Sequence, residues 1–279
     1  MTMTPDQYCE EQAAASGSSF YYSFLFLEPS RRQAIVALYA FCREVDDVVD
    51  ECVDPGLAAT KLAWWRSEVD ALYAGHPSHP VTRALAAAVG RYPISRAQLL
   101  EIIAGMEMDL LQNRYADFAE LRLYCHRVAG VVGLAAASIF GHTRTDTLRY
   151  AEQLGLAFQL TNIIRDVGED AERGRIYLPL DEMQRYGVTA ADILARRTSE
   201  EFRRLMEFQI ARAESAYAEA LALLPPEDRR AQRAGLVMAA IYRRLLANIK
   251  ANGCRVLESR ARLSPLTKLW LAWRTWLRG

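Results

Sequence analysis

Apolar residues recur at intervals of three and four along several stretches of more than 20 residues in this chain. One such stripe contains Phe202, Met206, Ala213, Tyr217 and Leu224. This spacing gathers apolar side chains on one face of a helix, and helices of this length are roughly 30 Å long. No run of alternating β-branched residues is present. The pattern therefore predicts an all-α fold.

Four capping patterns mark where helices are expected to begin. Each has a capping residue followed three positions later by an acid or an amide: Ser30-x-x-Gln33, Ser95-x-x-Gln98, Asp117-x-x-Glu120 and Thr198-x-x-Glu201. We expect helices near residues 6–15, 30–51, 57–74, 80–90, 95–113, 117–140, 146–170, 199–224, 227–251 and 265–277. No Pro/Gly/Ser-rich linker divides them, so we predict one all-α domain over residues 1–279, a bundle able to enclose a deep cavity.

The composition argues against several classes of function. The chain has 34 basic and 34 acidic residues, so no nucleic acid is expected as a partner. Its four histidines form no H-E-x-x-H or E-x-x-H pattern, which argues against zinc-protease and di-iron sites. Five cysteines without C-x-x-C spacing, and no signal peptide ahead of them, predict reduced thiols in a cytoplasmic protein.

An acidic run from Arg43 to Glu51 directly follows an apolar helical stretch. Within it, Asp46 and Asp50 are four residues apart, and Arg43 is in phase with both, so the three side chains share one helix face. Like charges placed in this way repel each other, and a cation would offset the repulsion. Taken alone, the run is interpreted equally well as a solvated polar helix end.

A second acidic run, 120 residues further along, favours the functional interpretation. Four oxygen-bearing side chains stand at i, i+3, i+7 and i+11 of an otherwise apolar helix: Gln159, Asn162, Asp166 and Asp170. Buried oxygens must be satisfied, and Mg²⁺ prefers ligands of this kind. Arginines lie beside both runs, and guanidinium groups complement a diphosphate. Two such helices facing each other would form a site that binds and ionises a diphosphate.

Other candidates are weaker when judged from the residues alone. The segment from Ser18 to Tyr22 is interpreted as a polar loop with core aromatic residues, and Tyr124 and Tyr242 as core tyrosines. Gly130, Gly133 and Gly141, within and just after an apolar run, would permit close helix packing or leave cavity space.

These residues together resemble the squalene/phytoene synthase family of head-to-head prenyltransferases. The resemblance covers nearly the whole chain, and its most specific parts are YAFCREVDDVVDE and QLTNIIRDVGEDAERGRIYLP. Within the family, SSFYYSFLFL and LTKLWLAWRTWLRG look most like the presqualene diphosphate synthases of bacterial hopanoid biosynthesis. The resemblance implies an isoprenoid-synthase fold, a helix bundle around a deep central cavity.

The resemblance also implies roles for individual residues. Several Mg²⁺ ions would be held by Asp46, Asp50, Asn162, Asp166 and Asp170. The diphosphate sites would be lined by Ser19, Arg43, Gln159, Arg165, Arg175 and Tyr177. Two tyrosines near the reacting carbons join four of the aspartates as the expected catalytic residues: Tyr124, Tyr242, Asp46, Asp50, Asp166 and Asp170. One departure from the family pattern is that Ser16 or Gly17 stands where family members have a histidine.

The implied reaction is the 1'–1 condensation of two farnesyl diphosphates to presqualene diphosphate, for squalene and hopanoid biosynthesis. Two relatives in the same family are alternatives: a phytoene synthase using geranylgeranyl diphosphate, and a full squalene synthase that reduces the intermediate with NADPH. No G-x-G-x-x-G follows a predicted strand, so NADPH is not expected to be required. A distant alternative is a non-catalytic acidic helical binding protein, which would need neither the arginines nor the polar stripe.

The C-terminal segment, residues 265–278, has an amphipathic pattern of its own. Its apolar residues recur at three and four, and basic residues accompany them: Leu266, Leu269, Trp270, Trp273, Trp276 and Leu277, with Lys268, Arg274 and Arg278. This pattern is typical of a helix in a lipid headgroup layer. It fits equally a helix that closes the bundle. The two expectations are thus peripheral contact with the inner face of a membrane, or packing on the bundle.

Overall fold

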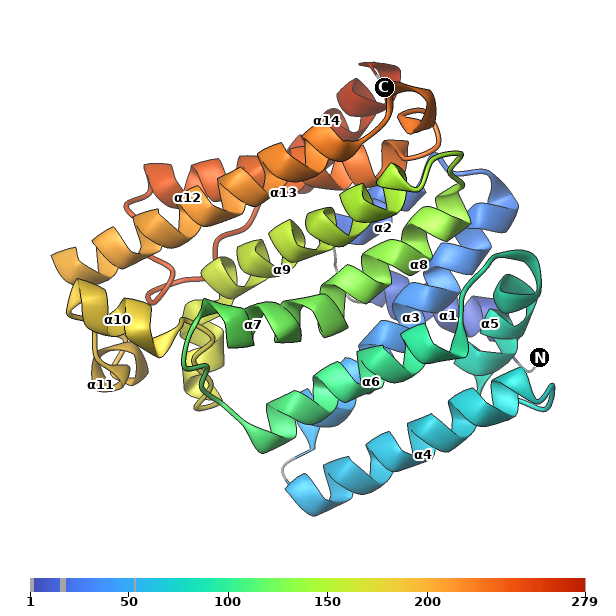
Figure 1. Ribbon diagram of the computed structural model, residues 1–279, viewed down its shortest axis with the longest axis horizontal. Coiled ribbons are helices and arrows are strands. Elements are labelled where there is room, and N and C mark those ends of the chain that lie inside the picture. The colour runs from blue at the N-terminus through green and yellow to red at the C-terminus, as the bar shows by residue number, and fades with distance from the viewer. Residues whose placement is uncertain (1–2, 16–18, 53, 279) are drawn as a thin grey trace.

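The computed structural model describes residues 3–15, 19–52 and 54–278, and this part of the chain is helical, with no strand (Figure 1). The all-α prediction is confirmed. In chain order the helices are α1 (Pro5–Ala15), α2 (Ser19–Phe24), α3 (Pro29–Glu51), α4 (Pro55–Tyr73), α5 (Pro80–Arg91), α6 (Arg96–Leu111), α7 (Phe118–Cys125), a π-helical turn η1 (His126–Gly130), α8 (Val131–Phe140), α9 (Asp146–Glu172), α10 (Leu180–Tyr186), α11 (Ala190–Leu194), α12 (Glu200–Leu223), a 3₁₀ turn η2 (Pro226–Asp228), α13 (Arg233–Ala251) and α14 (Pro265–Arg278).

Two of the four predicted helix starts are confirmed. Ser95 and Gln98 form a reciprocal capping box at the start of α6, because each side chain accepts a hydrogen bond from the other residue's backbone N–H. Asp117 caps α7 by accepting a hydrogen bond from the backbone N–H of Glu120. Both caps satisfy donors that the first turn of a helix leaves unpaired.

The other two predicted starts were wrong by one or two residues. Helix α3 begins at Pro29, and the carboxylate of Glu28, rather than Ser30, accepts the capping hydrogen bond. Proline is suited to the first helical position because its missing N–H would have no partner there. Helix α12 begins at Glu200 with Ser199 as its cap, in place of Thr198.

The predicted helix over residues 117–140 is divided into α7, η1 and α8. The stretch Phe118–Phe140 is long and apolar enough to cross a membrane by length and composition alone. A core helix passes the same test, and α8 packs against α3, α6 and α9. Three short helices, α2, α10 and α11, were not predicted, because one or two turns carry too little apolar periodicity to stand out.

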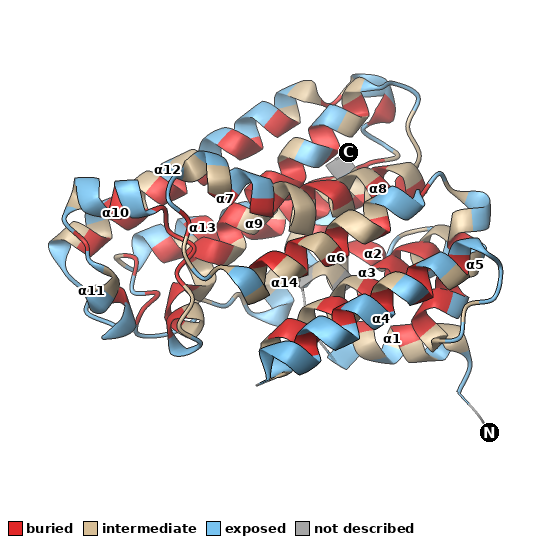
Figure 2. Cartoon of the chain, turned by 60° about the horizontal axis from the view of Figure 1, so that its bottom comes forward, coloured by how far each residue is buried: buried red, intermediate tan, exposed pale blue. Residues whose placement is uncertain are grey.

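Buried apolar residues form two clusters. One centres on α9, α12 and α13, and the other on α3, α4, α5, α6 and α8. Figure 2 shows buried residues along the faces that these helices turn towards each other. Phe20 of α2 and Val128 of η1 pack against both clusters. The single-domain expectation for residues 1–279 stays a prediction.

Helix α9 approaches both α8 and the turn η1 closely, and two glycines make this possible. A Cβ atom at Gly133 would overlap the backbone carbonyl of Ala151, and one at Gly155 would overlap the carbonyl of Ala129. The close packing expected at Gly133 is therefore confirmed. It fixes α9, which carries the second acidic run, against the π-helical turn.

Asp228, in the turn η2 before α13, ties that turn to the start of α9. Its buried carboxylate accepts hydrogen bonds from the backbone N–H groups of Thr143 and Arg144 and from the hydroxyls of Thr143 and Thr147, at 2.5–3.0 Å. Burial opposes ionisation, but these hydrogen bonds outweigh it and lower the pKa of Asp228 to about 2.

We expect Asp228→Asn to lower the free energy of unfolding at pH 7 by about 2 kcal/mol. Because the pKa is lower in the folded chain, the carboxylate stabilises the fold above about pH 4, and this contribution is lost as the pH falls towards 2. Urea unfolding across this pH range measures the effect. The control is Asp70→Asn, at an exposed pair with Arg96, which should change the free energy of unfolding much less. Equal losses in the two variants at pH 7 would contradict this account.

Candidate active site

A cavity of about 730 Å³ lies among α2, α3, α6, α8, α9 and α13. Part of its wall is apolar and aromatic, with residues such as Phe20, Ile102 and Phe158. Another part carries carboxylates and guanidinium groups from the C-terminal halves of α3 and α9. The two acidic runs of the sequence thus face one cavity.

On the α3 side, Arg43 holds the first group of acids. Its guanidinium donates to Asp46 at 2.7 Å and forms an ion pair with Asp47. Burial, and then repulsion by the neighbouring Asp50, raise the pKa of Asp46 to about 7. Arg43 therefore offsets only part of the cost of placing these carboxylates together.

On the α9 side, two arginines contact the carboxylate of Asp166. Arg165 donates to it at 2.7 Å from the same helix. Arg260, from the segment between α13 and α14, lies 2.8 Å from Asp166 and 3.2 Å from Glu169. Burial, and then repulsion by Asp166, raise the pKa of Asp170 to about 8.

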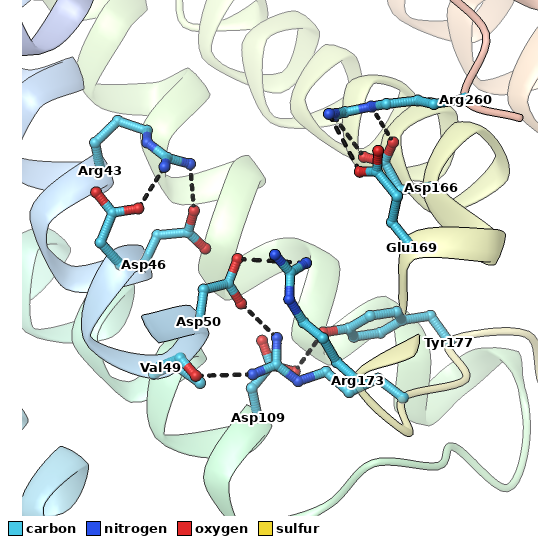
Figure 3. Close-up of polar contacts among 12 residues, drawn as sticks. Arg43, Asp46, Val49, Asp50, Asp109, Asp166, Glu169, Arg173, Tyr177 and Arg260 are labelled. Carbon is cyan, nitrogen blue, oxygen red and sulfur yellow. Dashed lines mark hydrogen bonds and ion pairs between the residues drawn. The ribbon is translucent and has the colours of Figure 1, made fainter. Parts of the chain in front are cut away.

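Two arginines that follow α9 contact the end of α3 (Figure 3). Arg175 donates to Asp50 at 2.6 Å and to the backbone carbonyl of Val49 at 3.0 Å. Arg173 forms a longer ion pair with Asp50, at 3.8 Å. Figure 3 shows Asp50 between the arginines. These contacts join the end of α3 to the chain just beyond α9, although 125 residues separate Asp50 from Arg175. Both motifs therefore face the same cavity, while the roles of their residues stay predictions.

Asp109 of α6 is an acid of this site that the sequence analysis missed. Its carboxylate accepts hydrogen bonds from the hydroxyls of Tyr124 and Tyr177, each at 2.9 Å. The two rings stack with their centroids 5.2 Å apart. Burial raises the pKa of Asp109 to about 6, against the opposing effects of Arg175 and the two tyrosines. A signal was present, because Asp109 continues the stripe of Ile102 and Met106 that lines the cavity.

A second aromatic group forms the wall near α13. Tyr242 lies 5.2 Å from Phe158 and 6.2 Å from Phe20, measured between ring centroids, and both contacts are edge-to-face. Burial raises the pKa of Tyr242, against the opposing effect of the nearby Arg165 charge, so this ring stands between the charged and apolar parts of the wall. Aromatic faces in such a position can stabilise a nearby cation.

All but one of the predicted site residues line this single cavity. Those placed there are Arg43, Asp46, Asp50, Tyr124, Gln159, Asn162, Arg165, Asp166, Asp170, Arg175, Tyr177 and Tyr242. Ser19 begins α2, but its side chain lies outside the described part of the structure. Ser16 and Gly17, at the departure from the family pattern, also lie outside the described residues. Arg260 was missed because its segment shows no periodic pattern.

As the side chains stand, no group of three or more His, Cys, Asp or Glu residues in the described part of the chain is arranged around one metal position. Arginines pair with several of the acids instead. Even so, the residues fit Mg²⁺. The buried Oδ1 atom of Asn162 has no hydrogen-bond partner, and its amide donates to Gln159 at 3.2 Å. Asp46 and Asp170 are carboxylates with incomplete charge compensation, and every candidate ligand atom is an oxygen.

Comparison with known proteins gives a consistent result. The family described as squalene/phytoene synthase matches residues 13–267. A phytoene synthase of Arthrospira platensis is 38% identical over 94% of this chain and 89% of its own length. Plant chloroplastic phytoene synthases are longer, and this chain spans 65% of one from Zea mays.

Solved structures agree in fold. A dehydrosqualene synthase matches with a TM-score of 0.85 and 29% identity, over 97% of this chain and 95% of its own. The squalene synthase HpnC from Alicyclobacillus acidocaldarius matches with a TM-score of 0.79 and 28% identity, over 89% of this chain and 94% of its own. With paired acids and arginines around one cavity in this fold, the chain belongs to the squalene/phytoene synthase family, whose members are head-to-head prenyltransferases.

Proposed function

We propose that the cavity binds two geranylgeranyl diphosphates and joins them head to head, as in phytoene synthesis. The main support for such a site is that two oxygen-rich helix faces, with arginines between them, lie beside an apolar and aromatic wall. The choice of a C20 prenyl diphosphate is supported by curated relatives that are phytoene synthases, at up to 38% identity over nearly the whole protein. This departs from the farnesyl diphosphate expected from the sequence.

A second candidate keeps that expectation: condensation of two farnesyl diphosphates to presqualene diphosphate. Two observations favour it. The solved structures at 28–29% identity are a dehydrosqualene synthase and a squalene synthase. The segments SSFYYSFLFL and LTKLWLAWRTWLRG also resemble presqualene diphosphate synthases. In this second candidate, the product would be used in hopanoid biosynthesis.

In either case the charged wall is proposed to bind the two diphosphates. Bound Mg²⁺, held by Asp46, Asp50, Asn162, Asp166 and Asp170, would neutralise diphosphate oxygens and favour departure of diphosphate from an allylic carbon. Arg43, Arg165 and Arg175 now pair with those same acids. When the acids turn to a metal, the planar guanidinium groups become available to phosphate oxygens, which they bind in bidentate fashion.

The apolar wall is proposed to serve the reacting carbons. Phe20, Phe158 and Tyr242 cluster beside the charged wall, where an allylic cation would form. Their faces stabilise the cation, and the surrounding apolar side chains keep water from quenching it. Tyr124, whose hydroxyl donates to Asp109, also lines the cavity and is proposed to orient the second substrate.

We expect the purified chain with Mg²⁺ to convert geranylgeranyl diphosphate to a C40 product, and to do so without NADPH. Product analysis by chromatography and mass spectrometry, with each diphosphate offered alone and then both in competition, measures the preference. NADPH is included in a parallel arm.

Preference for farnesyl diphosphate with arrest at presqualene diphosphate would favour the second candidate. Reduction to squalene only when NADPH is present would identify a full squalene synthase. Failure to couple either diphosphate would contradict both candidates. Omission of Mg²⁺ is the negative control.

We also expect Asp109→Asn to lower kcat by about 10- to 100-fold, because a charged hydrogen-bond acceptor contributes about 1.5–3 kcal/mol. Each carboxylate oxygen of Asp109 accepts a hydrogen bond from one tyrosine hydroxyl. The asparagine amide has only one oxygen and cannot replace both bonds. Steady-state kinetics on the preferred diphosphate give kcat and KM separately.

Tyr177→Phe and the double variant Asp109→Asn/Tyr177→Phe complete the test as a mutant cycle. If Asp109 acts by orienting the tyrosine, the double variant loses little more than Asp109→Asn alone. Fully additive losses, or wild-type kcat in Asp109→Asn, would show that Asp109 has no such role.

A further inference from the structure

Helix α14 has one apolar face packed on the bundle and a second one exposed. The packed face contains buried Ala272, and Trp276, whose ring lies 5.3 Å from that of Phe26 and under the guanidinium of Arg233. Through this face α14 contacts α2 and α13. Figure 1 shows it at the edge of the molecule, beside the C-terminus. The expectation of a closing helix thus holds for one face, and Trp276 belongs to that face.

The exposed face holds two tryptophans and three leucines. Leu266 is 79% exposed, Trp273 56% and Leu277 64%, and Leu269 and Trp270 are exposed as well. Their spacing of three, four and seven places all five on one side of the helix. A contiguous exposed apolar face of this kind marks an interaction site, whereas single exposed apolar residues are ordinary. Because the opposite face is fixed to the bundle, the fold itself cannot cover these side chains.

The charge around this face identifies its partner. From Arg255 to Arg278 the chain has six basic residues and one acid, although its net charge is zero overall. The guanidinium of Arg274 lies 5.0 Å from the ring of Trp270, so positive charge accompanies the apolar face itself. Anionic phospholipid headgroups attract such a segment, and interfacial tryptophans are amphipathic enough to sit among them. A second copy of the chain would bring the same positive charge against it.

Helix α14 also borders the active-site cavity, through the side that packs on the bundle. Lys268 of α14 lines the cavity, together with Arg260, Arg262 and Leu263 of the segment that precedes the helix. The helix that carries the exposed face is therefore also part of the cavity wall.

We propose that α14 docks the protein on a bilayer surface that contains anionic phospholipid, with Leu266, Leu269, Trp270, Trp273 and Leu277 inserted among the headgroups. The proposal does not depend on which prenyl diphosphate is used, and it is tested without substrate. The helix lies in the plane of the surface, because its other face stays on α2 and α13.

The test is co-sedimentation of the full chain with vesicles of equal parts phosphatidylglycerol and phosphatidylcholine, compared with phosphatidylcholine alone. We expect binding to the anionic vesicles that weakens as salt is raised. The variant Trp270→Ser/Trp273→Ser should bind at least about tenfold more weakly while keeping the thermal unfolding temperature of the parent. The matched control is Leu57→Ser/Trp64→Ser, which removes exposed apolar side chains from α4 and should bind as the parent does.

Several results would overturn the proposal. Undiminished vesicle binding by Trp270→Ser/Trp273→Ser would do so, as would equal binding to neutral and anionic vesicles. So would a parent chain that stays in the supernatant at every lipid concentration. A parent that self-associates, with a monomeric Trp270→Ser/Trp273→Ser variant and no vesicle binding, would assign the face to a second copy of the chain instead.

Discussion

The arrangement of this site depends on the compensation of half-buried carboxylates by arginines. Asp46, Asp50, Asp166 and Asp170 are half-buried and line one cavity, where water screens their repulsion only in part. Contacts from Arg43, Arg165, Arg175 and Arg260 offset part of this repulsion. They also connect α3, α9 and the segment before α14, so the same contacts that relieve the charge define the cavity.

The arginines compensate the charge of the carboxylates only in part. This suits a site in which the carboxylates exchange an arginine for a metal ion. Burial, and then repulsion between neighbouring carboxylates, raise the pKa values of Asp46 and Asp170 in spite of the arginines. A divalent cation relieves that repulsion more fully than a shared guanidinium does, and the displaced arginines then face an anion. Metal and diphosphate binding are therefore expected to support each other, in a chain whose family performs head-to-head prenyl transfer.

The sequence was most informative where a pattern repeats over several turns. The long helices, the Ser95 and Asp117 caps and the shared face of Asp166 and Asp170 all follow from periodicity. It failed where one residue depends on distant packing. Asp109 is a single acid whose meaning comes from Tyr177, 68 residues away, and Arg260 reaches Asp166 from a segment without regular structure. No local sequence pattern predicts the prenyl chain length of the substrate. Farnesyl diphosphate was predicted, whereas the curated relatives are phytoene synthases.

The central claim is that the two acidic runs form one metal and diphosphate site. Titration with Mn²⁺, followed by electron paramagnetic resonance in the presence of inorganic diphosphate, tests it directly on the full chain. The account predicts that Asp46→Asn and Asp166→Asn each weaken diphosphate-dependent Mn²⁺ binding by at least about tenfold. Asp70→Asn, at an exposed ion pair on α4, should bind as the parent does. Parent-like Mn²⁺ binding in either of the first two variants would contradict a site shared between α3 and α9.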